Sequence, residues 1–103
     1  MRILKFKVEK QKITKDPTCD FSNIAKGTKG YLVADFSFSP DWDKCVKVGV
    51  FRALGGNEVA APIIKGQCVI PSEALIANMF YVSAIGQKEG YRIATEKTEV
   101  EQS

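Results

Sequence analysis

The segment YLVADFSFSPDWDKCVKVGVFR, residues 31–52, decides the fold class of this chain. Apolar and polar side chains alternate on both sides of a short turn, Pro40-Asp41-Trp42-Asp43. Such alternation is typical of half-buried β-strands, because successive side chains of a strand point to opposite faces of its sheet. The segment therefore predicts two neighbouring core strands, residues 32–38 and 46–52, joined by the turn.

Shorter alternating segments recur along the rest of the 103-residue chain, separated by turns rich in glycine, proline and polar residues. They amount to about seven or eight strands at roughly ten-residue spacing, with one candidate helical turn at residues 71–76. This pattern predicts an all-β protein, either an antiparallel sandwich or a barrel. We expect a single domain over residues 1–97 and a polar, disordered tail over residues 98–103.

The two central strands carry apolar residues on both faces. The alternation assigns one set to the core: Leu32, Ala34, Phe36, Phe38, Val46, Val48 and Val50. Tyr31, Val33 and Phe51 then fall on the opposite face, which should meet solvent. A sheet that is apolar on both faces needs a second cover, either another layer of the same domain or a neighbouring subunit. We therefore predict Tyr31, Val33 and Phe51 as a candidate protein interface.

The turn between these strands offers two interpretations. Asp41 and Asp43 could form a carboxylate pair or part of a calcium loop, but calcium requires six to eight oxygen ligands and no EF-hand spacing is present. The simpler interpretation makes Trp42, Asp41 and Asp43 a structural anchor. Trp42 then plugs the end of the sandwich, and the aspartates accept hydrogen bonds from backbone amides.

No arrangement of residues suits catalysis. The chain has no histidine, which removes Ser-His and Cys-His nucleophiles and every histidine-ligated metal site. Cys19, Cys45 and Cys68 are widely spaced and no CxxC occurs, so we expect three free thiols and no zinc site. We therefore expect a protein that is not an enzyme and has no catalytic residue, cofactor or metal.

The charges and apolar runs limit the classes of partner. Lys5 and Lys7 share one face of the first strand, and the formal net charge is only +3. We interpret these lysines as a solvated face of an edge strand, which makes a nucleic-acid partner unlikely in this chain. No apolar run is long enough for a signal peptide or a membrane span, so we expect cytosolic synthesis and no membrane partner.

An alternative hypothesis is a small module that binds carbohydrate or single-stranded nucleic acid. It would combine the lysine-rich first strand with a stacking platform of exposed aromatic residues. The candidate platform residues are Tyr31, Trp42, Phe51, Tyr81 and Tyr91.

Three short segments carry a resemblance to a known class of domain: FSFSPDWD at 36–43, VFR at 50–52 and CVIP at 68–71. In this order the chain resembles small β-sandwich domains of phage and prophage virion proteins. It is similar to the N-terminal domain of upper baseplate proteins and to related minor structural proteins. The resemblance implies an all-β, antiparallel immunoglobulin-like β-sandwich of about seven or eight strands, with at most one short helical turn. It also implies an attachment module for a baseplate, tail or capsid. The partners would be other virion proteins or further copies of the chain, which is made in the host cytoplasm and then joins the virion.

Overall fold

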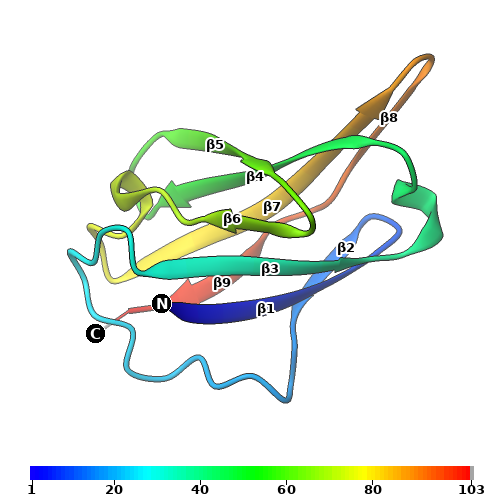
Figure 1. Ribbon diagram of the computed structural model, residues 1–103. Coiled ribbons are helices and arrows are strands. Elements are labelled where there is room, and N and C mark those ends of the chain that lie inside the picture. Colours follow the sequence, from blue (N-terminus) through cyan, green and yellow to red (C-terminus); the bar gives the residue numbers. More distant parts are fainter. Residues whose placement is uncertain (103) are drawn as a thin grey trace.

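Alternating apolar and polar side chains form the strands of the computed structural model, which describes residues 1–102 (Figure 1). Within this part of the chain the strands are β1 (Arg2–Glu9), β2 (Lys12–Lys15), β3 (Leu32–Phe38), β4 (Val46–Ala53), β5 (Glu58–Ile63), β6 (Gln67–Val69), β7 (Met79–Lys88), β8 (Tyr91–Ala94) and β9 (Thr98–Glu101). Two single-turn 3-10 helices also form, η1 (Pro40–Trp42) and η2 (Ser72–Ala74). The prediction of an all-β protein is confirmed, with η1 as a second helical turn beside the expected one. No helix within residues 1–102 is long and apolar enough to cross a membrane.

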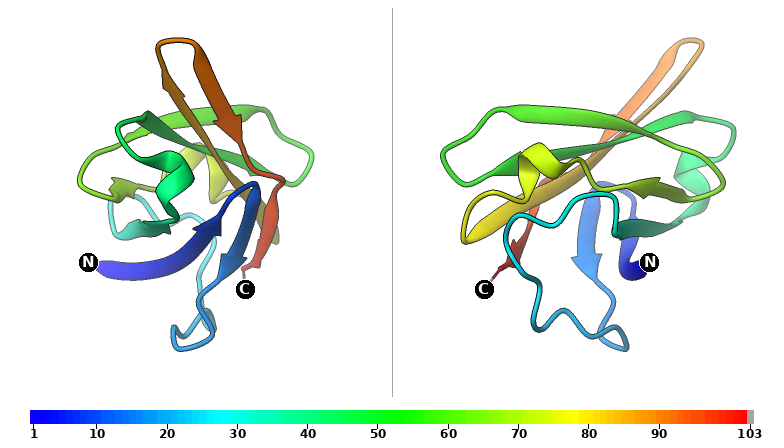
Figure 2. Two further views of the ribbon diagram at one scale, coloured as in Figure 1. Left: turned by 90° about the vertical axis from the view of Figure 1, so that its right-hand side faces the viewer. Right: turned by 60° about the vertical axis from the view of Figure 1, so that its left-hand side comes forward.

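The strands form two sheets that pack face to face (Figure 1; Figure 2). The first sheet has the order β2-β1-β3-β6, and the second has the order β5-β4-β7-β8, with β9 pairing to the other half of β7. The predicted β-sandwich is therefore confirmed. Its two sheets are joined along one side, where the turn Lys65-Gly66 connects β5 of the second sheet to β6 of the first.

The central pair of the first sheet, β1 and β3, is parallel, with Ile3 opposite Val33 and Lys5 opposite Asp35. This corrects the expectation of a purely antiparallel sandwich. Parallel neighbours need a connection of about a dozen residues or more, because the chain must return along the sheet before the second strand begins. The β2 hairpin and the irregular segment 16–31 provide this return, and Figure 1 shows the segment below the first sheet.

The two strands that flank η1 lie in different sheets, β3 in the first and β4 in the second. The expectation that residues 32–38 and 46–52 are adjacent strands is therefore wrong, although both contribute to the core. The connection over residues 39–45 contains η1 and spans the distance between packed sheets, which is about 10 Å. Strand β4 instead pairs with β5 on one side and β7 on the other.

Strand β4 presents to the core the face opposite to the predicted one. Phe51 and Ala53 point inward and are 0% and 1% exposed, whereas Val46 on the other face is 78% exposed. The strand carries apolar side chains on both faces, so alternation alone does not decide which face is buried. The Phe51 ring packs over Gly49, where an added Cβ would lie 2.9 Å from the ring. This close approach gives the large aromatic ring the space it needs inside.

Residues 98–101 form β9, which pairs with the first half of β7. The expected disordered tail over 98–103 is therefore wrong for residues 98–102, and Ser103 lies outside the described residues. The reason is a single apolar side chain, Val100, which is fully buried in the core while Glu99 and Glu101 on either side are exposed. One valine at the right register is enough to fix a short strand against an existing sheet.

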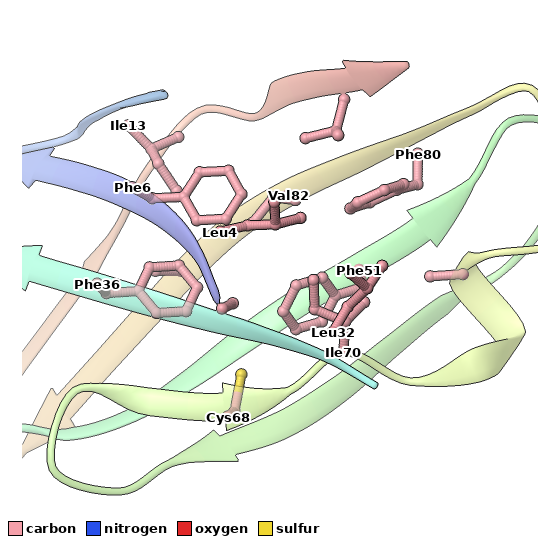
Figure 3. Close-up of a cluster of buried hydrophobic side chains, with 14 of the residues drawn as sticks. Leu4, Phe6, Ile13, Leu32, Phe36, Phe51, Cys68, Ile70, Phe80 and Val82 are labelled. Carbon is pink, nitrogen blue, oxygen red and sulfur yellow. The ribbon is translucent and has the colours of Figure 1, made fainter. Parts of the chain in front are cut away.

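Both sheets contribute large side chains to one core (Figure 3). The labelled members are Leu4, Phe6, Ile13, Leu32, Phe36, Phe51, Cys68, Ile70, Phe80 and Val82. Ile24, from the irregular segment 16–31, is buried in the same cluster and helps to close it. Full burial of one such side chain contributes about 1.5–3 kcal/mol. Apolar packing is therefore the main stabilising term for this sandwich.

Candidate functional site

Trp42 closes one end of the sandwich, as the sequence predicted. Its ring is fully buried, and the ring centroids of Trp42 and Phe38 are 5.0 Å apart. A Cβ at Gly86 of β7 would lie 2.7 Å from the indole, so glycine at this position leaves room for the ring. The indole Nε1 donates a hydrogen bond to the Lys10 carbonyl oxygen at 2.8 Å, which ties η1 to the β1–β2 turn. Trp42 is therefore a structural anchor.

The two aspartates of the turn act mainly through their backbone. The Asp41 carboxylate accepts a hydrogen bond from the Ser39 hydroxyl at 3.0 Å, and its carbonyl oxygen accepts one from the Tyr91 hydroxyl at 2.7 Å. The Asp43 carbonyl oxygen accepts a hydrogen bond from Lys88 Nζ at 3.1 Å. The expected bonds from backbone amides to these two carboxylates do not form within residues 1–102. Instead, the side chains of Tyr91 and Lys88 donate to these main-chain carbonyl oxygens and hold the β7–β8 hairpin against the turn around η1.

Phe51, predicted as an interface residue, belongs to the core. It is among the largest fully buried side chains of the protein. The prediction was wrong because it assigned Val46, Val48 and Val50 to the buried face of the same strand, which left Phe51 on the outer one. Phe51 therefore contributes to stability, and a functional surface must be built from other side chains.

The other two predicted interface residues lie on or beside the outer face of the first sheet. Val33 is the centre of a row with Ile3 of β1 and Val69 of β6, each paired directly with it across the sheet. Ile3 and Val69 are 44% and 47% exposed, and Val33 is buried between them. Tyr31, which precedes β3, is 51% exposed. The structure thus places Tyr31 and Val33 in an exposed apolar surface and adds Ile3 and Val69 to it.

This apolar surface continues around the joined side of the sandwich. A shallow groove beside β5 and β6 is lined in part by Val33, Val69, Ile64 and Pro62. Pro62 pairs with Val48 on the outer face of the second sheet, and Val48 pairs with Ile85. We call the whole surface the apolar band; its members are Met1, Ile3, Tyr31, Val33, Val46, Val48, Pro62, Ile64, Val69 and Ile85.

Sequence reasoning missed most of the apolar band. The alternation assigns Val46 and Val48 to the core, whereas Val46 is exposed and Val48 half-buried. Ile64 lies directly before the Lys65-Gly66 turn and is exposed as well. The available signals are an isoleucine next to a polar turn and a strand that is apolar on both faces. Neither signal shows which face is covered.

The edges of both sheets are poorly suited to the addition of another strand. Strand β2 has four residues and β6 has three, and the edge strand β5 contains Pro62, which has no N–H to donate. The fourth edge is divided between β8 and β9, which pair with opposite halves of β7. A protein partner would therefore meet this domain through a sheet face rather than a sheet edge.

The five aromatic residues of the alternative hypothesis do not share one exposed surface. Two of them, Trp42 and Phe51, are fully buried. A third, Tyr81, lies on the outer face of the second sheet, where Arg52 Cζ and Lys97 Nζ are 4.4 and 4.5 Å from its ring centroid. These rings therefore form no continuous platform on which sugars or bases could stack.

The three cysteines are free, in agreement with the sequence prediction of unpaired thiols. Cys45 and Cys68 are buried, and Cys19 is half-buried. Burial raises the pKa of the Cys68 thiol from 9.0 to about 11. Because the folded pKa lies above the unfolded pKa, the unfolded state loses this proton first as pH rises. The stabilising effect of the neutral thiol is therefore present below about pH 9 and is lost between about pH 9 and pH 11.

We expect Cys68 to react slowly with iodoacetamide while the protein is folded. The thiolate is the reactive form, and a pKa raised by about two units lowers its fraction roughly 100-fold near pH 8. Peptide mass spectrometry of an alkylation time course, with and without urea, measures the rate at Cys68 directly. Equal rates in the two conditions would show that the fold does not protect this thiol.

The segments that carry the resemblance to virion domains serve packing in this structure. The rings of Phe36 and Phe38 stack on each other, and Trp42 lies against Phe38. Cys68 and Ile70 of the CVIP segment are core residues. Most of their apolar side chains therefore pack in the core, whereas Val69 of CVIP lies in the apolar band. No protein-family model, curated protein or solved structure matches the chain.

Proposed function

We propose that this protein is a non-enzymatic attachment module that binds another protein through the apolar band. In line with the sequence resemblance, we propose a partner from the baseplate, tail or capsid of a phage or prophage particle. The observation that carries the proposal is the apolar surface around the joined side of the sandwich, in which Ile3, Val46, Ile64 and Val69 are exposed.

The apolar band has the composition expected of an interface centre. Ile3, Val46, Ile64 and Val69 are large apolar side chains with exposed fractions between 44% and 78%. Covering such side chains contributes about 25 cal/mol for each Å² of apolar surface removed from water. Contiguous apolar surface bordered by polar residues is typical of protein interaction sites. A standard interface uses about 20–30 residues on each side, so the apolar band would form its centre and the neighbouring charged residues its rim.

A single substitution with a matched control tests this proposal. Ile64 and Ile76 are 67% and 69% exposed, but Ile76 lies outside the apolar band. Figure 1 shows the segment around η2, which precedes Ile76, at the end of the sandwich opposite the β5–β6 turn. Neither side chain belongs to the core, so Ile64→Asp and Ile76→Asp should both fold like the wild type.

We expect Ile64→Asp to weaken partner binding about tenfold or more, because a carboxylate would be buried in an apolar contact. Ile76→Asp should bind like the wild type. The measurement is pairwise co-expression with each protein encoded beside the gene, followed by affinity purification and size-exclusion chromatography. Equal binding by the two variants, or no wild-type complex with any of these proteins, would refute the proposal. Salt-sensitive binding of an oligonucleotide or glycan that survives Ile64→Asp would support the small-ligand alternative instead.

A further inference from the structure

We infer that a second copy of this chain covers the first-sheet part of the apolar band, in a symmetric dimer that pairs Lys5 of each copy with Asp35 of the other. The inference rests on the proposed function, because it assigns an occupant to one part of the same surface. The part around Ile64, on the joined side of the sandwich, then remains free for a virion partner.

The parallel pair β1 and β3 sets the geometry of this dimer. On the outer face of the first sheet, three residues of β1 lie directly opposite three residues of β3. The pairs are Ile3 with Val33, Lys5 with Asp35, and Lys7 with Ser37. Consider a two-fold axis just above the sheet, parallel to the strands and midway between them. It places β1 of one copy over β3 of the other and keeps every row in register.

Two of the three rows then contain complementary side chains. Ile3 of one copy meets Val33 of the other, which covers apolar surface. Lys5 meets Asp35 of the second copy, and the symmetry forms this contact twice. An axis centred on β3 would instead place the Asp35 carboxylates of the two copies against each other, which is unfavourable. Charge complementarity therefore selects the axis between β1 and β3.

Lys5 and Asp35 are available for this contact in the single copy. Within residues 1–102 they form no salt bridge, and the Asp35 carboxylate accepts only a long hydrogen bond of 3.5 Å from Gln67 Nε2. A second carboxylate near Lys5 belongs to Asp16. It already accepts hydrogen bonds from the Thr18 backbone N–H at 2.9 Å and the Thr18 hydroxyl at 2.8 Å. A second copy would give both Lys5 and Asp35 a partner of opposite charge.

Two charge reversals, Lys5→Asp and Asp35→Lys, provide the test. Alone, Lys5→Asp places two carboxylates together in each symmetric contact, and Asp35→Lys places two ammonium groups together. In a mixed dimer, the new carboxylate at position 5 meets the new ammonium group at position 35. The unchanged Asp35 of the first variant likewise meets the unchanged Lys5 of the second. Both contacts are then restored, although each copy still carries its own like-charged pair.

We expect sedimentation equilibrium to show a wild-type dimer in the micromolar range and dimerisation about tenfold weaker or more for each variant alone. An equimolar mixture should dimerise as strongly as the wild type. A wild type that stays monomeric at ~100 μM, or a mixture as weak as its components, would overturn the dimer. Thermal unfolding of each variant alone checks that it is folded.

Two further measurements keep the inference separate from the proposed function. The wild-type dimer should weaken as salt increases, because its contacts include charged pairs near the surface. A dimer that is insensitive to salt would overturn the Lys5–Asp35 contact without the use of any variant. Ile64→Asp should dimerise like the wild type, so loss of a virion partner in that variant tests the proposed function alone.

Discussion

Replacement of Trp42 by alanine is expected to lower the free energy of unfolding by about 3–5 kcal/mol, because it empties a closed site at the end of the sandwich. The ring is fully buried and lies between Phe38 and Gly86. The hydrogen bond to the Lys10 carbonyl oxygen is lost as well. Each kcal/mol corresponds to about 4–8 °C in melting temperature for a domain of this size. Thermal unfolding followed by far-ultraviolet circular dichroism measures the change.

Trp42→Phe separates the ring packing from the hydrogen bond. Phenylalanine keeps an aromatic ring in the site but has no N–H to donate to Lys10. The unsatisfied carbonyl should cost about 1–3 kcal/mol. We therefore expect a melting temperature between those of the wild type and Trp42→Ala. A wild-type melting temperature for Trp42→Ala would show that η1 does not anchor the sandwich.

Phe51→Asp is expected to abolish cooperative folding. The side chain is fully buried in the centre of the core, among apolar residues of both sheets (Figure 3). Removal of a buried phenylalanine costs about 3–5 kcal/mol, and an unpaired carboxylate in its place adds a large desolvation penalty. The sum is comparable with the whole stability of a small domain, about 5–15 kcal/mol. Near-ultraviolet circular dichroism and limited proteolysis should both report an unfolded chain.

Val46→Asp is the matched control in the same strand. Val46 lies on the outer face of β4 and is mostly exposed, so its replacement should change stability by no more than about 0.5 kcal/mol. The two variants together test which face of β4 points inward. If Phe51→Asp folded and Val46→Asp did not, the inward face would be the one that the sequence predicted.

The fold class could be predicted from the sequence because it depends on local patterns. The alternation over residues 31–38 shows the two-residue period of a strand. The residues of the turn at 40–43 mark where that strand ends. The role of Trp42 followed from similar reasoning, since a large aromatic residue in a turn between apolar strands must be covered. These predictions concern single elements, and the structure bears them out.

The remaining errors concern relations between distant elements. Alternation did not show that β1 and β3 pair in parallel, because the pairing depends on the path of segment 16–31 rather than on either strand. It did not reveal β9 either, since the burial of Val100 depends on an open position beside β7. The inward face of β4 depended on the packing of Phe51 over Gly49. In each case the deciding contact lies outside the segment that shows the pattern.

The same limit applies to the candidate site. Tyr31 and Val33 could be identified because they are apolar residues on the second face of a recognisable strand. Ile64 and Val46 could not. Ile64 lies beside the turn that joins the two sheets, and Val46 is exposed because β4 presents its other face to the core. A surface formed from strands of both sheets and the β5–β6 turn becomes visible only when these elements are placed side by side.

On the ribosome, this chain cannot finish folding before residues 98–102 have emerged, because β9 completes the second sheet and Val100 completes the core. At about 5–20 residues per second, roughly 3–13 s separate the synthesis of β3 from that of residue 102. Throughout that interval the inner face of the first sheet has no complete second sheet to cover it. The nascent chain is therefore most vulnerable to aggregation while it is being made, and a translation pause after β3 would lengthen this period. Once folded, the same chain has only short or interrupted sheet edges to offer to its neighbours.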